Sequence, residues 1–296
     1  MRHSFRPVTI QVLIASIAAL VVTACAGRGG QLAQQTATSV ASEVPPSTAR
    51  AGDPIPIEGL RGPETAAAAA RALTEVETAL RSTDSPAPTL GRRQQLAYRA
   101  ISAHPAWAAT VLARVPAEVR DAVQANLDAG DALSGLTGEA PPAFPQWEIR
   151  MPQPAATLRD FYDEAEVATG IPWAYLAAIH LVETRMGRIH GLSSAGARGP
   201  MQFIPETWAS YGEGDIDDDD DAIRAAGRYL ASRGGPADMG RALFSYNNDE
   251  RYVEAVEAYA SVLLADPRAY AGYHQWQVFY ATTAGTFLLP EGFTTA

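Results

Sequence analysis

One carboxylate stands inside an apolar stretch of this sequence. Between Trp173 and Met186 the chain is nearly continuous apolar sequence, and Glu183 is the acidic residue within it. A helix that is apolar on all sides is buried, and an ionised carboxylate in such a helix is costly unless it is paired, solvated or used in chemistry. Burial favours the protonated form, so Glu183 is a candidate proton donor near neutral pH.

The start of this helix decides where Glu183 lies along it. Pro172 suits a first helical turn, because its missing N–H would have no partner there. Glu183 then falls near the C-terminal end, where the helix dipole also disfavours the ionised form. The alternative interpretation is a buried Glu183 satisfied by an arginine or a backbone N–H. His180, one turn earlier, is interpreted as a helix-packing residue.

A glycine-punctuated loop follows the helix. Gly187, Gly191, Gly196 and Gly199 precede the segment Met201-Gln202-Phe203. Glycines allow backbone and small side chains to approach a ligand closely, and functional residues are concentrated on loops. The sequence therefore predicts a ligand-binding cleft that has Glu183 at one side and this loop at the other.

The order of these residues resembles a known family. Glu183 is followed by a threonine, the loop ends in Gly-x-Met-Gln-Phe-x-Pro, and a Tyr-Asn pair comes later. This ordered set is similar to that of the lytic transglycosylases of bacterial cell walls, which resemble goose-type lysozyme in fold. The resemblance extends over about half of the chain, and its motifs are Glu183-Thr184, a serine at Ser193 or Ser194, Gly196-Ala197, Gly199, Met201 to Pro205, Thr207-Trp208 and Tyr246-Asn247.

The resemblance implies a reaction and a substrate. Glu183 would protonate the glycosidic oxygen between N-acetylmuramic acid and N-acetylglucosamine in peptidoglycan strands, and would then take a proton from the muramoyl C6 hydroxyl to close a 1,6-anhydro ring. Most glycosidases need two carboxylates, and no second one stands out here. No metal or organic cofactor is expected. The alternatives are a lysozyme-type hydrolase that uses water, and a non-catalytic peptidoglycan-binding scaffold.

The resemblance also assigns substrate contacts. The Tyr246 phenol is expected to reach towards the catalytic carboxylate. Gln202 is expected to bind sugar, with loop structure as the alternative, and Met201 and Phe203 belong to types that more often pack than bind. Asn248-Asp249 departs from the Ala-Gly that follows the Tyr-Asn pair in some branches. The expected substrate-binding residues are Ser193, Ser194, Met201, Gln202, Phe203, Tyr246 and Asn247.

Composition limits the fold and the partners. The 296 residues carry a formal net charge of −10 and are 47% hydrophobic, which is enough for a sizeable core but argues against a nucleic-acid partner. Alanine is plentiful and β-branched runs are scarce. We expect an all-α, mostly helical, lysozyme-like catalytic domain, a small helical N-terminal unit, and a short hairpin or irregular packing in the aromatic tail. A monomer is expected.

The N-terminus resembles an export signal. Basic residues precede an apolar stretch from Val8 to Val22, which is too short to span a membrane comfortably. The segment that ends at Cys25, the one cysteine of the chain, is similar to the lipobox of bacterial lipoproteins. This implies cleavage before Cys25 and lipid on its thiol, which would anchor the exported protein outside the cytoplasmic membrane. The alternative is an ordinary signal peptide and a free thiol.

Composition shifts predict the division of the chain. We expect a signal peptide at 1–24, a disordered tether at 25–63, a helical accessory region at 64–135, a Pro/Gly linker at 136–154 and the catalytic domain at 155–296. Trp147 and Ile149 are expected to anchor the linker. Within the catalytic domain, the run Asp217 to Asp221 is interpreted as a solvated loop in which Asp221 caps a helix over 222–233, with calcium binding left open.

Overall fold

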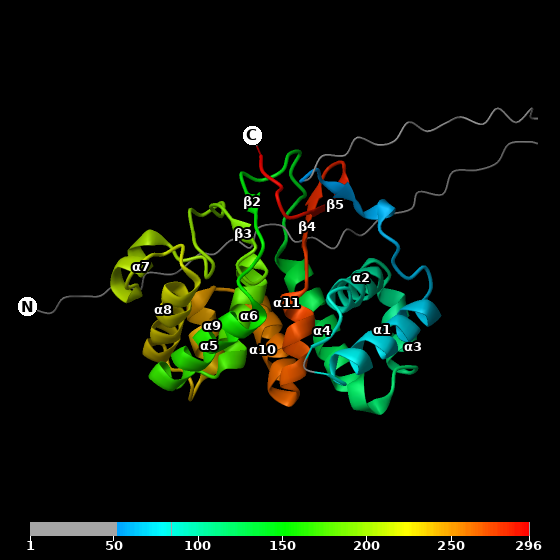
Figure 1. Ribbon diagram of the computed structural model, residues 1–296, viewed down its shortest axis with the longest axis horizontal. Coiled ribbons are helices and arrows are strands. Elements are labelled where there is room, and N and C mark those ends of the chain that lie inside the picture. The colour runs from blue at the N-terminus through cyan, green and yellow to red at the C-terminus, as the bar shows by residue number, and fades with distance from the viewer. Residues whose placement is uncertain (1–51, 84, 296) are drawn as a thin grey trace, which may run out of the picture.

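The computed structural model describes residues 52–83 and 85–295, and it confirms the mostly helical prediction (Figure 1). The helices at the N-terminal end of the described chain lie on one side, α7, α8 and α9 lie on the other, and α6, α10 and α11 lie between them. The α-helices are α1 (Ala66–Leu80), α2 (Leu90–Ala103), α3 (Ala108–Leu112), α4 (Ala117–Leu136), α5 (Ala155–Thr169), α6 (Trp173–Thr184), α7 (Pro205–Tyr211), α8 (Asp219–Ser232), α9 (Met239–Tyr246), α10 (Glu250–Ala265) and α11 (Tyr270–His274).

Helix α6 is the buried helix that the apolar stretch predicts. It begins directly after Pro172, and all of its residues except Tyr175 are buried. Its partners are α5, α8 and α10, which pack around it. The preceding helix, α5, ends at Gly170, whose φ of 76° gives the left-handed cap expected for that glycine. Glu183 therefore lies in the last turn of a helix that is surrounded by protein.

The N-terminal helices share a core with the rest of the molecule. Helix α4 packs along α10, and the apolar side chains of both belong to one continuous cluster that also contains α6. Hydrogen bonds cross the same boundary: the Tyr273 hydroxyl donates to Asn126 Oδ1 at 2.9 Å, and Trp276 Nε1 donates to Gln94 Oε1 at 2.8 Å. The region predicted to be a separate accessory unit thus shares one core with the helices from α5 onwards.

A three-stranded antiparallel sheet closes one face of the molecule. Strands β4 (Val278–Thr282) and β5 (Gly285–Leu289) form the hairpin expected in the tail, and β1 (Ile55–Pro56) pairs with β5. A 3-10 turn, η1 (Ile57–Gly59), follows β1. Residues 55–59 therefore have regular structure, and the predicted end of the tether at residue 63 lies too far along the chain. The pairing of β1 joins segments more than 200 residues apart, and local composition does not encode it.

The Pro/Gly segment at 136–154 lies against the segment after α6 and the C-terminal hairpin. Strand β2 (Glu148–Ile149) pairs with β3 (Ile189–His190), which follows α6. Trp147 and Ile149 are buried and belong to a second apolar cluster with the C-terminal hairpin. Both residues thus anchor the segment as predicted. The two further 3-10 turns are η2 (Pro105–Trp107) and η3 (Pro267–Ala269).

The acidic run caps α8 from a different position than expected. Asp218 is the N-cap, and its side chain accepts a hydrogen bond from the N–H of Asp221 at 3.1 Å. Asp221 instead accepts from the N–H of Asp215 at 2.8 Å. The prediction that Asp221 caps the helix was wrong, because α8 begins three residues earlier. No group of three or more candidate metal ligands occurs in the described part of the chain.

The predictions for the extreme N-terminus lie outside the described residues. These are the signal peptide at 1–24, the lipidation of Cys25 and most of the tether. Within residues 52–83 and 85–295, no helix combines the length and apolarity that crossing a membrane requires.

Candidate active site

Glu183 is almost completely enclosed, with 9% of its surface exposed. The Tyr252 hydroxyl donates a hydrogen bond to Glu183 Oε1 at 2.8 Å. Burial raises the pKa of Glu183 to about 8, and the Tyr252 hydrogen bond opposes the shift because it favours the carboxylate. The described residues supply no cation that forms an ion pair with it. Glu183 therefore carries a proton at neutral pH, as a general acid must.

A second buried glutamate shows what a purely structural carboxylate looks like in this chain. Glu77 of α1 is fully buried, and it is paired with Arg81 one turn later. It also accepts hydrogen bonds from the Tyr98 hydroxyl and from Gln94 Nε2. Glu77 thus has an arginine partner and two further hydrogen-bond donors, whereas Glu183 has a single tyrosine donor. This contrast argues against the structural alternative for Glu183, in which an arginine would hold it.

The phenol that contacts Glu183 comes from Tyr252. The sequence resemblance assigned this reach to Tyr246, but the Tyr246 hydroxyl donates to the carbonyl oxygen of Met201 at 2.6 Å. The two tyrosine rings are stacked, with centroids 6.3 Å apart and planes 4° from parallel. Tyr246 thus supports Tyr252 and fixes the loop, and Tyr252 touches the carboxyl group. The sequence indicates the role of Tyr252 only weakly. A tyrosine on the buried face of α10 needs a hydrogen-bond partner for its hydroxyl, but the sequence does not say which one.

Tyr252→Phe is expected to shift the pH dependence of cleavage. Loss of the hydroxyl removes the group that favours the carboxylate, so the pKa of Glu183 rises further and the alkaline fall in activity moves to higher pH. Tyr246→Phe is the matched control, since its hydroxyl bonds Met201. Rate measurements across pH 5 to 10 test this. An unchanged alkaline limb in Tyr252→Phe, or an equal shift in both variants, would contradict it.

The backbone after Glu183 is held in an unusual conformation. Arg185, Met186 and Gly187 have φ values of 56°, 61° and 79°, so two non-glycine residues adopt the left-handed region in succession. Thr184 secures this turn: its hydroxyl donates to the Pro200 carbonyl at 2.6 Å and accepts from the Gly187 N–H at 3.1 Å. Strained backbone of this kind is concentrated at functional sites. The turn connects the helix end to the glycine loop.

The loop itself closes in a tight turn. Arg198 and Phe203 exchange two backbone hydrogen bonds, at 3.0 and 2.9 Å. Gln202 sits inside the turn with a φ of 50°, and its side-chain Nε2 donates to the Gly199 carbonyl at 2.9 Å. Met201 and Phe203 are buried in the main core, so their side chains shape the loop. The Nε2 hydrogen bond fits the loop role for Gln202, and sugar binding by this residue stays a prediction.

The remaining predicted residues have distinct environments. Ser193 is buried, and its Oγ accepts from the N–H groups of Ala195 and Ala197 at 3.2 and 3.0 Å, which leaves its hydroxyl proton for another partner. Ser194 is exposed. Asn247 is buried at the C-cap of α9. Hydrogen bonds and ring stacking thus join Met201, Tyr246, Tyr252 and Glu183. Among the described residues, no hydrogen bond joins Ser193 or Ser194 to Glu183.

Gly199→Ala is expected to destabilise the protein by about 3 kcal/mol or more, because a clash and backbone strain add together. Gly199 has a φ of 77°, and an added Cβ would overlap the carbonyl oxygen of Ile216. Gly196→Ala is the control: its φ is 81° but its Cβ would meet nothing within 4 Å, so only the backbone cost of about 1 kcal/mol applies. Urea unfolding measures both, and equal losses would contradict the clash.

A cavity of about 310 Å³ adjoins the loop and the strained turn. Its lining is rich in polar and charged side chains, which suits a hydroxylated ligand. Near it, His180 is fully buried, as the prediction of a helix-packing residue requires. Its Nδ1 shares a hydrogen bond with the Tyr162 hydroxyl at 2.7 Å, and its Nε2 lies 3.4 Å from Asp219 Oδ1. The lining residues are Arg150, Gly187, Ile189, His190, Gly191, Leu192, Arg198, Gly199, Pro200, Asp217 and Asp219.

The region that contains Glu183, the glycine loop and the two stacked tyrosines matches a known family model. Residues 160–264 match the family model described as "Transglycosylase SLT domain". The chain is also similar to a protein named membrane-bound lytic murein transglycosylase F from Thiobacillus denitrificans, with 32% identity over 130 residues. That alignment covers 41% of this chain and 27% of the relative, so the chain spans about a quarter of the relative's length. No solved structure matches the chain.

Proposed function

We propose that the chain is a peptidoglycan lytic transglycosylase, because residues 160–264 match the family model described as "Transglycosylase SLT domain". The observation that carries this proposal is Glu183, a carboxyl group inside the matched region whose pKa is raised to about 8 by burial. Its side chain retains some exposure and one tyrosine partner. A protonated carboxyl group in that setting is suited to donate a proton to a leaving glycosidic oxygen.

Glu183 serves in both halves of the proposed reaction. As the acid it gives its proton to the oxygen that links N-acetylmuramic acid to N-acetylglucosamine, and the bond from muramoyl C1 to that oxygen breaks. As the carboxylate it then accepts the proton of the muramoyl C6 hydroxyl while that oxygen bonds to C1. Glu183 ends protonated, water is not consumed, and the products are an N-acetylglucosamine end and a 1,6-anhydro end.

The tyrosine donor fits this double role. The Tyr252 hydrogen bond favours the carboxylate, so it stabilises Glu183 after the proton has left. Within residues 52–83 and 85–295, no second carboxylate contributes to the pKa of Glu183, whereas a hydrolase of the usual kind has two acidic groups flanking the bond. This supports a reaction in which the substrate supplies the nucleophile. It favours the transglycosylase over a lysozyme-type hydrolase, and the protonated acid favours either enzyme over a binding scaffold.

Product mass is the test of the proposal. Purified peptidoglycan treated with the protein should release muropeptides lighter by one water than those released by a hydrolase. Products of hydrolytic mass would assign the chain to the lysozyme-type alternative. Retained binding to peptidoglycan with no soluble muropeptide would assign it to the scaffold.

The relative from Thiobacillus denitrificans is named as a membrane-bound protein, and this supports an envelope location for the chain. We propose that lipid on Cys25 provides the attachment, as the sequence before it suggests. In a bacterial host, Cys25→Ser should move the exported protein from the membrane fraction to the soluble fraction. A variant that stays on the membrane would contradict the lipid anchor.

A further inference from the structure

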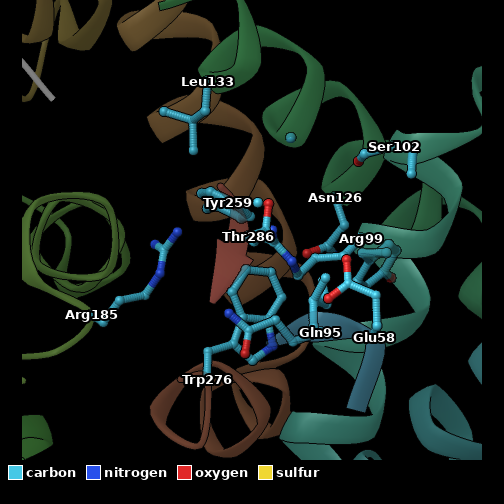
Figure 2. A pocket seen from close by; sticks show the side chains of 15 residues that line it. Glu58, Gln95, Arg99, Ser102, Asn126, Leu133, Arg185, Tyr259, Trp276 and Thr286 are labelled. Atoms are coloured by element: carbon cyan, nitrogen blue, oxygen red, sulfur yellow. The ribbon is translucent and has the colours of Figure 1, made fainter. Parts of the chain in front are cut away.

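A cavity of about 320 Å³ lies where the N-terminal helices meet α10 and the C-terminal hairpin. It contains neither Glu183 nor any residue of the glycine loop. Aromatic side chains of Tyr98, Tyr259 and Trp276 form much of its wall, and exposed residues at its rim, Glu58 and Ala103, open it to solvent. Figure 2 shows charged side chains entering it from opposite sides, with Arg185 on one side and Glu58 and Arg99 on the other.

Arg185 has an incomplete set of partners in this cavity. Its side chain is 4% exposed, and its Nη1 donates to the Leu181 carbonyl at 2.6 Å. Its Nε is buried without a hydrogen-bond partner, and the described residues offer it no carboxylate. Its guanidinium lies 5.9 Å from the centre of the Trp276 ring. A buried cation without an anion is costly, so this arrangement favours a ligand that brings one.

A second cation, Arg99, lines the cavity on the side opposite Arg185 (Figure 2). The Arg99 guanidinium stacks over the Phe279 ring at 4.4 Å, and it lines the same cavity as Arg185. Burial and the charge of Arg185 lower the pKa of Arg99 to about 10, which shows that the two cations repel each other. Glu58 is exposed at the rim, where solvent screens its charge.

We infer that this cavity binds a small organic carboxylate, with the anion against Arg185 and an apolar body against Trp276 and Tyr259. The aromatic wall argues for an organic ligand over a bare inorganic ion, and the volume is that of the smallest ligand pockets in proteins. An amino-acid derivative or the end of a short peptide has the required size and charge. The inference depends on the cavity alone and stands whether or not the proposed function does.

Paired probes that differ in charge test the anion requirement. N-acetylphenylalanine and its primary amide have the same shape, and titration calorimetry with the full chain should show at least 10-fold tighter binding of the carboxylate. A muropeptide with an unmodified peptide carboxylate, compared with its amidated form, separates a wall fragment from a free metabolite as the source. Equal binding of carboxylate and amide in both pairs, or no binding of either carboxylate, would overturn the inference.

Two variants locate the binding. Arg185→Gln should weaken carboxylate binding at least 10-fold and leave the amide unaffected. Gly130→Phe should fill the cavity from α4 without touching Arg185, and Gly130→Ala is its control, since a Cβ there would lie 3.6 Å from Ser102 Oγ, an ordinary contact. Thermal melting establishes that each variant is folded. If Arg185→Gln does not fold, carboxylate binding by Gly130→Phe is the deciding measurement. Unchanged binding in Gly130→Phe would place the ligand elsewhere and refute the assignment.

Discussion

Glu183→Gln is expected to lower the rate of peptidoglycan cleavage by about 10³-fold, within the range that a positioned general acid contributes. The amide matches the carboxyl group in shape and can still accept the Tyr252 hydrogen bond, so the surroundings of α6 should be preserved. Because the amide has no proton to give, the loss should appear in kcat. Release of soluble muropeptides under single-turnover conditions measures it.

The control makes the same substitution away from the site. Glu254→Gln changes a glutamate on the exposed side of α10, the helix that carries Tyr252, and it should cleave at the wild-type rate. Sedimentation of each protein with purified peptidoglycan should show that Glu183→Gln binds within about threefold of wild type. A Glu183→Gln variant that retains a tenth or more of wild-type activity would end the assignment of Glu183 as the acid.

The same substitution should stabilise the protein more as pH rises. In the folded protein the pKa of Glu183 is about 8, against an ordinary value of 4.5. Below pH 4.5 the group is protonated in both states. Between pH 4.5 and 8 the unfolded chain loses the proton and the folded protein keeps it, so the wild type loses stability across this window. The difference in free energy of unfolding between Glu183→Gln and wild type should grow by on the order of 5 kcal/mol.

Chemical denaturation at pH 4.5, 6 and 8 provides the measurement. Other groups titrate in the same range, but they do so equally in both proteins, and the difference isolates Glu183. In the exposed control Glu254→Gln, the corresponding difference should stay within about 0.5 kcal/mol across the same pH values. A constant difference for Glu183→Gln would show that the carboxyl group is solvated like an ordinary glutamate, and the case for a neutral acid would fail.

The parts of the fold that were predictable are those with local signals. Pro172 and the unbroken apolar run that follows specify α6, and Gly170 specifies the end of α5. The position of Glu183 in the last turn of its helix follows from those two features. The hairpin of β4 and β5 was likewise indicated by the aromatic tail. In each case neighbouring residues carry the information.

The features that the sequence did not predict depend on contacts between distant segments, or on a choice between neighbouring residues of the same type. Tyr252 and Tyr246 both face the core, and only the crossing of α10 over α6 decides which hydroxyl reaches Glu183. Asp218 and Asp221 belong to a run of similar residues, any of which suits a cap, so the start of α8 could not be chosen. The sequence around Arg185 does not indicate the cavity, because the N-terminal helices that enclose the cavity are remote from Arg185 in sequence.

The packing of α4 along α10 determines what a shortened protein would do. A fragment that starts at residue 155 would retain the matched region but would present the bare apolar flank of α10 to water, together with the unsatisfied hydroxyl of Tyr273. Such a fragment should aggregate, and the intact chain should melt in a single cooperative transition. It follows that the N-terminal helices cannot be exchanged as a module unless the flank of α10 changes with them.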